Sequence, residues 1–370
     1  MSDLGRQASN VGSSLQGWRQ HEPHRRYNAL LDEWMIVVPD RWHRPWQGHD
    51  DDDKAKDNAD DARNNPLKPG GIRKDGIVTP NYESTYVFTN DFPALRPRTD
   101  ATDAPDDATS LFRDQRIYGT CRVMCYSPHS DVTLTTMETS EIVTVIEQWQ
   151  AELKDLGARY AWVSIFENRG TMVGCSNPHP HCQIWATDFL PNQIATKHRT
   201  QAQWLIAHGA PMLLQYVQQE VAAVERIVTM NDDWVVLVPY WACWPFETML
   251  LPRRRHVLRL TDLTRTEVHS LADIMKQLLV RYDNLFKCSF PFMMGWNGAP
   301  TGEYCQQDCS HWQLHATYLP PLLRSATVKK FMAAFEMLCE PQRDLSPELA
   351  AKLLRDTNGT VHYTQTQTDT

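Results

Sequence analysis

The chain has 370 residues, of which 42% are hydrophobic and 10% aromatic, and its formal net charge is −8. This apolar content excludes global disorder, and the negative charge argues against binding to a nucleic-acid backbone as the main task. No apolar run reaches the roughly 18 residues of a membrane span, and residues 1–25 contain no hydrophobic signal core. The nine cysteines are scattered and odd in number, which is typical of reduced thiols in a cytoplasmic protein.

The first half of the chain alternates short strands with polar loops. Residues 1–20 are rich in Ser, Gln and Gly and are predicted to be disordered, and the acidic stretch 49–66 predicts a solvated loop. A helix is predicted over Ser140–Leu156, because its apolar residues recur every three or four positions and Gly157 ends the pattern. Strand-like segments are predicted at 33–39, 85–90, 122–127, 131–136, 160–166 and 182–186.

The second half repeats this order. A long helix is predicted from about Arg265, where Thr264 and Glu267 form a capping box. Further elements are predicted as strands at 234–238, 248–251, 291–296 and 311–318, and as helices near 328–339 and 346–355. Both halves run through strands, a helix and then a strand with a histidine-rich tip, which reads HPHCQIW at 179–185 and HWQLHAT at 311–317. We therefore expect an α+β fold of two similar halves, 21–195 and 196–370.

The segment GCSNPHPHCQIW, residues 174–185, carries the strongest chemical signal. Its first half has the composition of a turn whose backbone N–H groups can face an anion. Its second half is a strand, so His179, His181 and Gln183 are expected to share one face. A neutral imidazole nitrogen is a good nucleophile toward phosphorus. Two alternating histidines on a strand more often only form hydrogen bonds in a core. The prediction of a catalytic histidine therefore depends on the whole 12-residue segment.

This string resembles the signature of galactose-1-phosphate uridylyltransferases, a branch of the histidine-triad superfamily. The resemblance extends from about His21 to Arg355. It includes the segments HRRYNAL, RPWQG, TPNYESTYVFTNDFPAL, FENRG, VPYWACWPFETMLLP, RYDNLF, PPLLRSATVKKFM and PQRDLSPE. The resemblance implies two histidine-triad-like halves, each an antiparallel sheet with packed helices, in a cytoplasmic homodimer whose active sites draw on both chains.

The resemblance also implies a mechanism. His181 would attack the α-phosphorus of UDP-glucose, and galactose 1-phosphate would then take the uridylyl group from this histidine. Gln183 would hold a phosphoryl oxygen where hydrolytic relatives carry a third histidine. Residues expected to bind the nucleotide, the phosphates or the hexose are Arg41, Arg44, Asn90, Asp91, Asn168, Gly174, Ser176, Lys330, Phe331, Glu336 and Gln342.

The metal positions of the family depart from its pattern in this chain. Bacterial members carry a CxxC pair where NNPLKPGG stands here. The family also has a second metal site, built from one glutamate and three histidines, which implies zinc. In this chain only His315 remains of these four ligands, because Lys197, Asn297 and Thr317 replace the others. Cys305, Cys309, His311 and His315 offer a less favoured substitute cluster. No organic cofactor is expected.

Two other functions compete with uridylyl transfer. A histidine-triad nucleotide hydrolase or phosphorylase is disfavoured by Gln183, because an amide cannot supply the proton that a third histidine could. A catalytically retired paralogue that binds UDP-sugars is suggested by the missing metal ligands, but it is disfavoured because His181, Gln183, Asn168 and Ser176 are all present.

Overall fold

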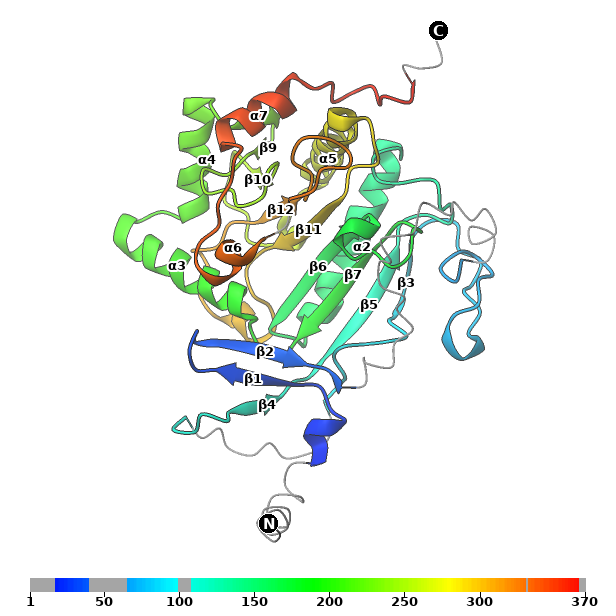
Figure 1. Cartoon of the computed structure of the whole chain (residues 1–370), viewed down its shortest axis with the longest axis vertical. Coiled ribbons are helices and arrows are strands. Elements are labelled where there is room, and N and C mark those ends of the chain that lie inside the picture. The colour runs from blue at the N-terminus through cyan, green and yellow to red at the C-terminus, as the bar shows by residue number, and fades with distance from the viewer. Residues whose placement is uncertain (1–16, 40–64, 99–107, 331, 366–370) are drawn as a thin grey trace, which may run out of the picture.

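The computed structural model describes residues 17–39, 65–98, 108–330 and 332–365 (Figure 1). Its main feature is a nine-stranded antiparallel sheet with the strand order β3-β5-β7-β6-β11-β12-β10-β9-β8. The first half supplies β3 (Tyr86–Thr89), β5 (Gly119–Cys125), β6 (Trp162–Arg169) and β7 (His181–Thr187). The second half supplies β8 (Ile227–Met230), β9 (Trp234–Leu237), β10 (Thr248–Pro252), β11 (Phe292–Asn297) and β12 (His315–Leu319).

The two halves meet in the middle of this sheet, where β6 pairs with β11. The antiparallel register places Phe166 opposite Gly295 and Arg169 opposite Phe292. Outward from this seam, the strands run β6-β7-β5-β3 on one side and β11-β12-β10-β9-β8 on the other, so β8 has no counterpart in the first half. In chain order, the first half runs β5, α2, β6 and β7, and the second half runs β10, α5, β11 and β12, so the long helix lies at the same point in both. The expected α+β fold of two similar halves is confirmed.

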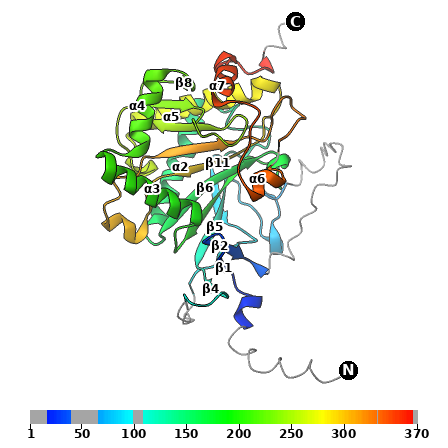
Figure 2. The ribbon, with the colours of Figure 1, turned by 60° about the vertical axis from the view of Figure 1, so that its left-hand side comes forward.

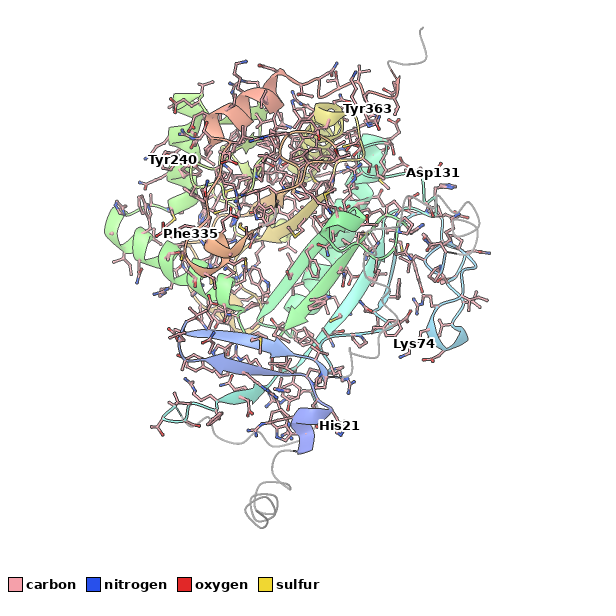
Figure 3. All side chains as sticks on the ribbon, in the orientation of Figure 1. His21, Lys74, Asp131, Tyr240, Phe335 and Tyr363 are labelled. Carbon is pink, nitrogen blue, oxygen red and sulfur yellow. The ribbon has the colours of Figure 1, made fainter. Side chains whose placement is uncertain are left out.

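Helices α2 (Thr139–Gly157) and α5 (Arg265–Phe286) pack against each other and share the main hydrophobic core. The helix predicted over Ser140–Leu156 is confirmed, and its Trp149 is fully buried, with Nε1 3.3 Å from the Cys182 sulfur of β7. Side chains fill the space between the sheet and its helices, whereas His21 and Lys74 lie at the periphery (Figure 3).

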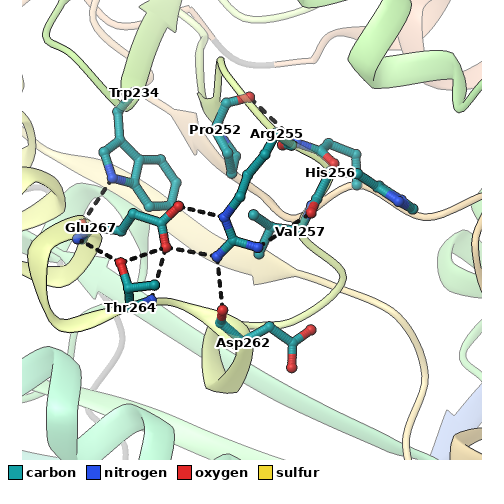
Figure 4. Close-up of polar contacts among 9 residues, drawn as sticks. Trp234, Pro252, Arg255, His256, Val257, Asp262, Thr264 and Glu267 are labelled. Carbon is teal, nitrogen blue, oxygen red and sulfur yellow. Dashed lines mark hydrogen bonds and ion pairs between the residues drawn. The ribbon is translucent and has the colours of Figure 1, made fainter.

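The predicted capping box at the start of α5 is present. The Glu267 carboxylate accepts hydrogen bonds from the backbone N–H and the hydroxyl of Thr264, at 2.8 and 2.9 Å. Arg255 donates two further bonds to the same carboxylate, each at 2.6 Å (Figure 4). Trp234 of β9 donates from Nε1 to the Glu267 carbonyl at 2.9 Å. The helix start is thereby joined to the sheet as well as capped.

The remaining elements surround the main sheet (Figures 1 and 2). Helices α3 (Asn192–His208) and α4 (Met212–Ala223) join the halves, and α6 (Ala334–Leu338) and α7 (Pro347–Asp356) follow β12. A separate three-stranded sheet has the order β2-β1-β4, from Glu33–Val37, His24–Asn28 and Asp114–Arg116. Across the described ranges, no helix combines the length and apolarity needed to cross a membrane.

Several predicted elements differ from the structure. Residues 131–136 form turns rather than a strand, the strand predicted from 311 begins at His315, and the helix predicted near 328–339 is confined to α6. Within the segment 1–20, Gly17–Gln20 form a short 3-10 helix, and the rest lies outside the described residues. Residues 192–223, for which no element is predicted, form α3 and α4.

Candidate active site

Strand β7 presents its two faces to different surroundings. Cys182, Ile184 and Ala186 are fully buried in the core shared with α2 and α5. His181 and Gln183 alternate with them and are half-buried on the opposite face. The predicted strand spacing therefore places the candidate nucleophile and the amide on one face of the sheet, away from the two long helices.

The tautomer of the neutral His181 ring follows from one hydrogen bond. Its Nδ1 atom lies 2.7 Å from the backbone carbonyl oxygen of His179. A carbonyl can only accept, so Nδ1 carries the proton and Nε2 keeps its lone pair. Burial lowers the pKa of His181, opposed by this backbone contact, which favours the neutral ring. The geometry supplies an imidazole with a defined nucleophilic nitrogen.

His179 is fully buried and is held at both ring nitrogens. The Tyr82 hydroxyl lies 2.8 Å from Nε2 and also donates to the Leu67 carbonyl at 2.8 Å, so it accepts from His179. The Ser130 hydroxyl, 2.8 Å from Nδ1, is then the donor on the other side. Burial lowers the pKa of His179 to about 4, which keeps the ring neutral. This Tyr82–His179–Ser130 clamp fixes the residue whose carbonyl orients His181.

The Gln183 amide is also oriented. The indole Nε1 of Trp185 donates to the Gln183 Oε1 atom at 3.1 Å. The NH₂ group is therefore the end of the side chain that can donate to an anionic oxygen. Phe166, opposite Gln183 on β6, packs edge-to-face against Trp185 and supports this arrangement.

The turn before β7 borders a cavity of about 230 Å³. Gly174 has φ +83°, a conformation that strains residues with a side chain, which accounts for glycine there. Asn168, Ser176 and His181 all line the cavity. The structure thus brings together the candidate nucleophile and two of the residues expected to bind phosphate.

Glu167 lines the same cavity and is 7% exposed. Its Oε2 atom accepts a hydrogen bond from the Tyr126 hydroxyl at 2.9 Å. Burial raises the pKa of Glu167 to about 7, although Arg169 and the Tyr126 contact oppose that shift. A carboxyl with a pKa near neutrality at this place was not a sequence expectation.

The residues expected at the nucleotide lie at the end of β3. The side-chain oxygen of Asn90 accepts a hydrogen bond from the Phe92 N–H at 2.9 Å, and the backbone N–H of Asn90 donates to the Cys121 carbonyl. Asp91 pairs with Arg73 at 3.3 Å. Because β3 pairs with β5 and β5 with β7, this segment lies two strands from the candidate nucleophile.

The residues expected at the hexose form a network of their own. Glu336 pairs with Lys330 at 3.5 Å and with Arg343, and it accepts from the Ala333 N–H at 2.8 Å. The Gln342 carbonyl also accepts from Arg343. Arg343 is the member of this group that sequence reasoning missed. The predicted residues Arg41, Arg44 and Phe331 lie outside the described residues.

The positions of the family's metal ligands do not fit a metal. Lys197 donates from Nζ to Asn297 Oδ1 at 3.0 Å, and a protonated ammonium offers no lone pair. His315 is buried beside them, and Thr317 follows on β12. The proposed substitute cluster does not form either, because the described residues contain no group of three or more His, Cys, Asp or Glu side chains placed to hold a metal ion.

Comparison with known proteins covers almost the whole chain. Residues 16–191 match the family model described as galactose-1-phosphate uridyl transferase, N-terminal domain, and residues 197–367 match its C-terminal domain. A galactose-1-phosphate uridylyltransferase of Rattus norvegicus is 51% identical, covering 98% of this chain and 95% of its own length. One of Haemophilus influenzae is 49% identical, over 92% and 96%.

Solved structures agree on the fold. A structure described as a uridylyltransferase superposes with a TM-score of 0.73 at 22% identity, over 90% of this chain and 97% of that one. An ADP-glucose phosphorylase from Arabidopsis thaliana gives a TM-score of 0.62 at 17% identity, over 92% and 100%. At these identities the likeness concerns architecture.

Proposed function

Because this chain belongs to the galactose-1-phosphate uridylyltransferase family, it is a nucleotidyltransferase, and we propose that it transfers UMP from UDP-glucose to galactose 1-phosphate. The observation that carries this proposal is the geometry of His181, whose Nδ1 atom is bound to a carbonyl and whose Nε2 is left as a nucleophile. The reaction belongs to galactose catabolism, the Leloir pathway.

The transfer has two displacements. In the first, His181 Nε2 forms a bond to the α-phosphorus, the bond to the bridging oxygen breaks, and glucose 1-phosphate leaves with the electron pair. In the second, a phosphate oxygen of galactose 1-phosphate attacks the same phosphorus and the phosphorus–nitrogen bond breaks. The imidazole becomes positively charged while it carries the uridylyl group, and the His179 carbonyl stabilises that charge through Nδ1–H.

The other site residues have proposed roles that suit their chemistry. Gln183 donates to a phosphoryl oxygen, Asn168, Gly174 and Ser176 bind phosphate, and Asn90 and Asp91 bind the nucleoside. Arg41 and Arg44 bind the diphosphate. Lys330, Phe331, Glu336 and Gln342 bind the hexose phosphate. No organic cofactor enters this scheme, because His181 supplies the nucleophile.

We further propose a division of the chain at 195/196 and a cytoplasmic homodimer. The two matched domain models support the division. All nine cysteines lie in the described residues and are free thiols, which suits a reducing compartment. Exposed Leu30, Leu31 and Phe112 near the three-stranded sheet suit contact with a second subunit. Light scattering of the purified protein tests the dimer, and a monomeric mass at all concentrations would contradict it.

The test of the proposed function is the intact mass of the protein after incubation with UDP-glucose, quenched at alkaline pH to preserve a phosphoramidate. We expect an added UMP located on His181 and none on the His181→Ala variant. His269→Ala, which changes an exposed histidine of α5, is the matched control and should still be labelled. UDP-glucose binding without an adduct would favour the retired paralogue instead.

A further inference from the structure

The cluster formed by Lys197, Asn297 and His315 lies on the same sheet face as the active site. His315 is opposite Asn297, and Thr317 is opposite Gly295, in the pairing of β12 with β11. Gly295 is in turn opposite Phe166, which is opposite Gln183. Directly opposed residues point to the same side of a sheet. Helix α3 brings Lys197 to this face.

The lysine is held in a defined place. Its Nζ atom donates to Asn297 Oδ1 at 3.0 Å, while Asn297 Nδ2 lies 3.3 Å from the Gly295 carbonyl. The latter contact turns the amide oxygen toward Lys197. Asn297 is 9% exposed and His315 is 2% exposed, so both polar groups depend on partners inside the protein.

The surrounding charges suit an internal cation. The buried carboxylate of Glu247 interacts with the charge of Lys197. The Nδ1 atom of His315 donates to the Gln313 carbonyl at 2.9 Å, so this side of the ring already has its partner within the protein.

We propose that the Lys197 ammonium takes the place of a structural metal ion in this chain and joins α3 to the adjacent ends of β11 and β12. One glutamate with a divalent cation carries a net charge of +1, and a single ammonium carries the same charge. The three replacements therefore act together. Lys197 supplies a cation where the family has a carboxylate, and Asn297 and Thr317 replace two imidazole ligands with groups that need no metal. The inference does not depend on the reaction that the enzyme catalyses.

The experiment measures metal content and thermal stability of the full chain. Protein from zinc- and iron-supplemented cultures is expected to contain less than about 0.1 metal ion per chain, with a Tm unchanged by EDTA. Lys197→Glu should lower Tm by about 3 °C or more, because it removes the donor to Asn297 and faces Glu247 with a like charge. Lys352→Glu makes the same charge change at an exposed position and should leave Tm within about 1 °C.

A second variant reverses the proposed replacement. The triple variant Lys197→Glu/Asn297→His/Thr317→His, together with His315, should bind one zinc ion per chain and lose Tm when EDTA removes it. Stoichiometric metal in the native protein that disappears in His315→Ala would overturn the proposal. So would a folded triple variant that binds no zinc, or a Lys197→Glu protein as stable as the native chain.

Discussion

His315 repeats in the second half the backbone contact that orients His181 in the first: each Nδ1 donates to the carbonyl two residues earlier, at 2.9 and 2.7 Å. Each histidine also begins its strand, β12 or β7. Their surroundings differ, because His315 is 2% exposed and lies beside Lys197, whereas His181 lines a cavity. Both halves thus retain the same histidine geometry, but only in the first half does this histidine line a cavity that a ligand can enter.

The Tyr82–His179–Ser130 clamp predicts a loss of rate without a loss of substrate affinity. Tyr82→Phe removes the acceptor of the His179 Nε2–H, and Ser130→Ala removes the donor to Nδ1. We expect each change to lower kcat by up to about 10-fold, with KM for UDP-glucose nearly unchanged, because His181 loses orientation. Tyr240→Phe, at an exposed position in Figure 3, is the control. A rise in KM at constant kcat would show that the clamp serves binding instead.

Gln183 is expected to protect the uridylylated enzyme from water. Gln183→His places an imidazole where it can donate a proton or polarise water, so release of UMP without acceptor sugar should rise about 10-fold or more. UMP release from UDP-glucose, followed by chromatography, measures this. Gln183→Leu should lose transfer without gaining hydrolysis. Equal UMP release from the native and histidine variants would contradict this role for the amide.

The activity should persist at mildly acidic pH. Burial lowers the pKa of His181 below its ordinary value of 6.5, and the proposed nucleophile is the neutral ring. The kcat/KM for exchange between UDP-glucose and labelled glucose 1-phosphate should therefore fall to half of its plateau only below pH 6.5. A midpoint above pH 6.5 in kcat/KM, with the protein still folded by circular dichroism, would contradict this assignment.

Glu167 makes stability depend on pH. Its pKa is about 7 in the folded protein and 4.5 without burial, so the folded state holds the proton more tightly. The contribution of this proton to the free energy of unfolding is fully present below pH 4.5 and is lost as pH rises through 7. Glu167→Gln keeps an acceptor for Tyr126 but does not ionise. Between pH 5 and 8, its free energy of unfolding should gain up to about 3 kcal/mol relative to the native protein.

Urea unfolding at several pH values measures this gain. The exposed Glu147→Gln on α2 is the matched control and should follow the native protein at every pH. Parallel pH profiles for Glu167→Gln and the native chain would show that the buried carboxyl is ionised throughout.

Local patterns predicted the parts of the fold that depend on neighbouring residues. The two-residue alternation of His181 and Gln183 was sufficient to place β7 and its polar face, and the stripe around Trp149 predicted α2. His179, expected on the same strand face, instead lies in the bend before β7 and is fully buried. Helix α3 escaped prediction because only Ile194 and Gln201 are buried along its 17 residues, which leaves almost no apolar stripe. At 131–136, the Thr133 N–H bonds the Thr136 hydroxyl, so a β-like composition forms turns.

The contacts that orient the site come from far along the chain. Tyr82 is 97 residues from His179, and Ser130 is 49 residues from it. A single hydroxyl in a loop carries no periodic signal, so the clamp required the folded structure. The replacement of metal ligands was visible from the sequence, but the contact between Lys197 and Asn297 was not, because it depends on how α3 lies against β11.

The seam between β6 and β11 also determines how this protein could be divided. Chains cut in the α3–α4 region would each expose a bare strand edge, with β6 on one fragment and β11 on the other. Such edges bind other strands readily, so either fragment by itself would tend to aggregate. Together they carry complementary edges and could reassemble by restoring the backbone ladder. The molecule is built from two repeats, yet the hydrogen bonds between β6 and β11 make each repeat depend on the other for a complete sheet.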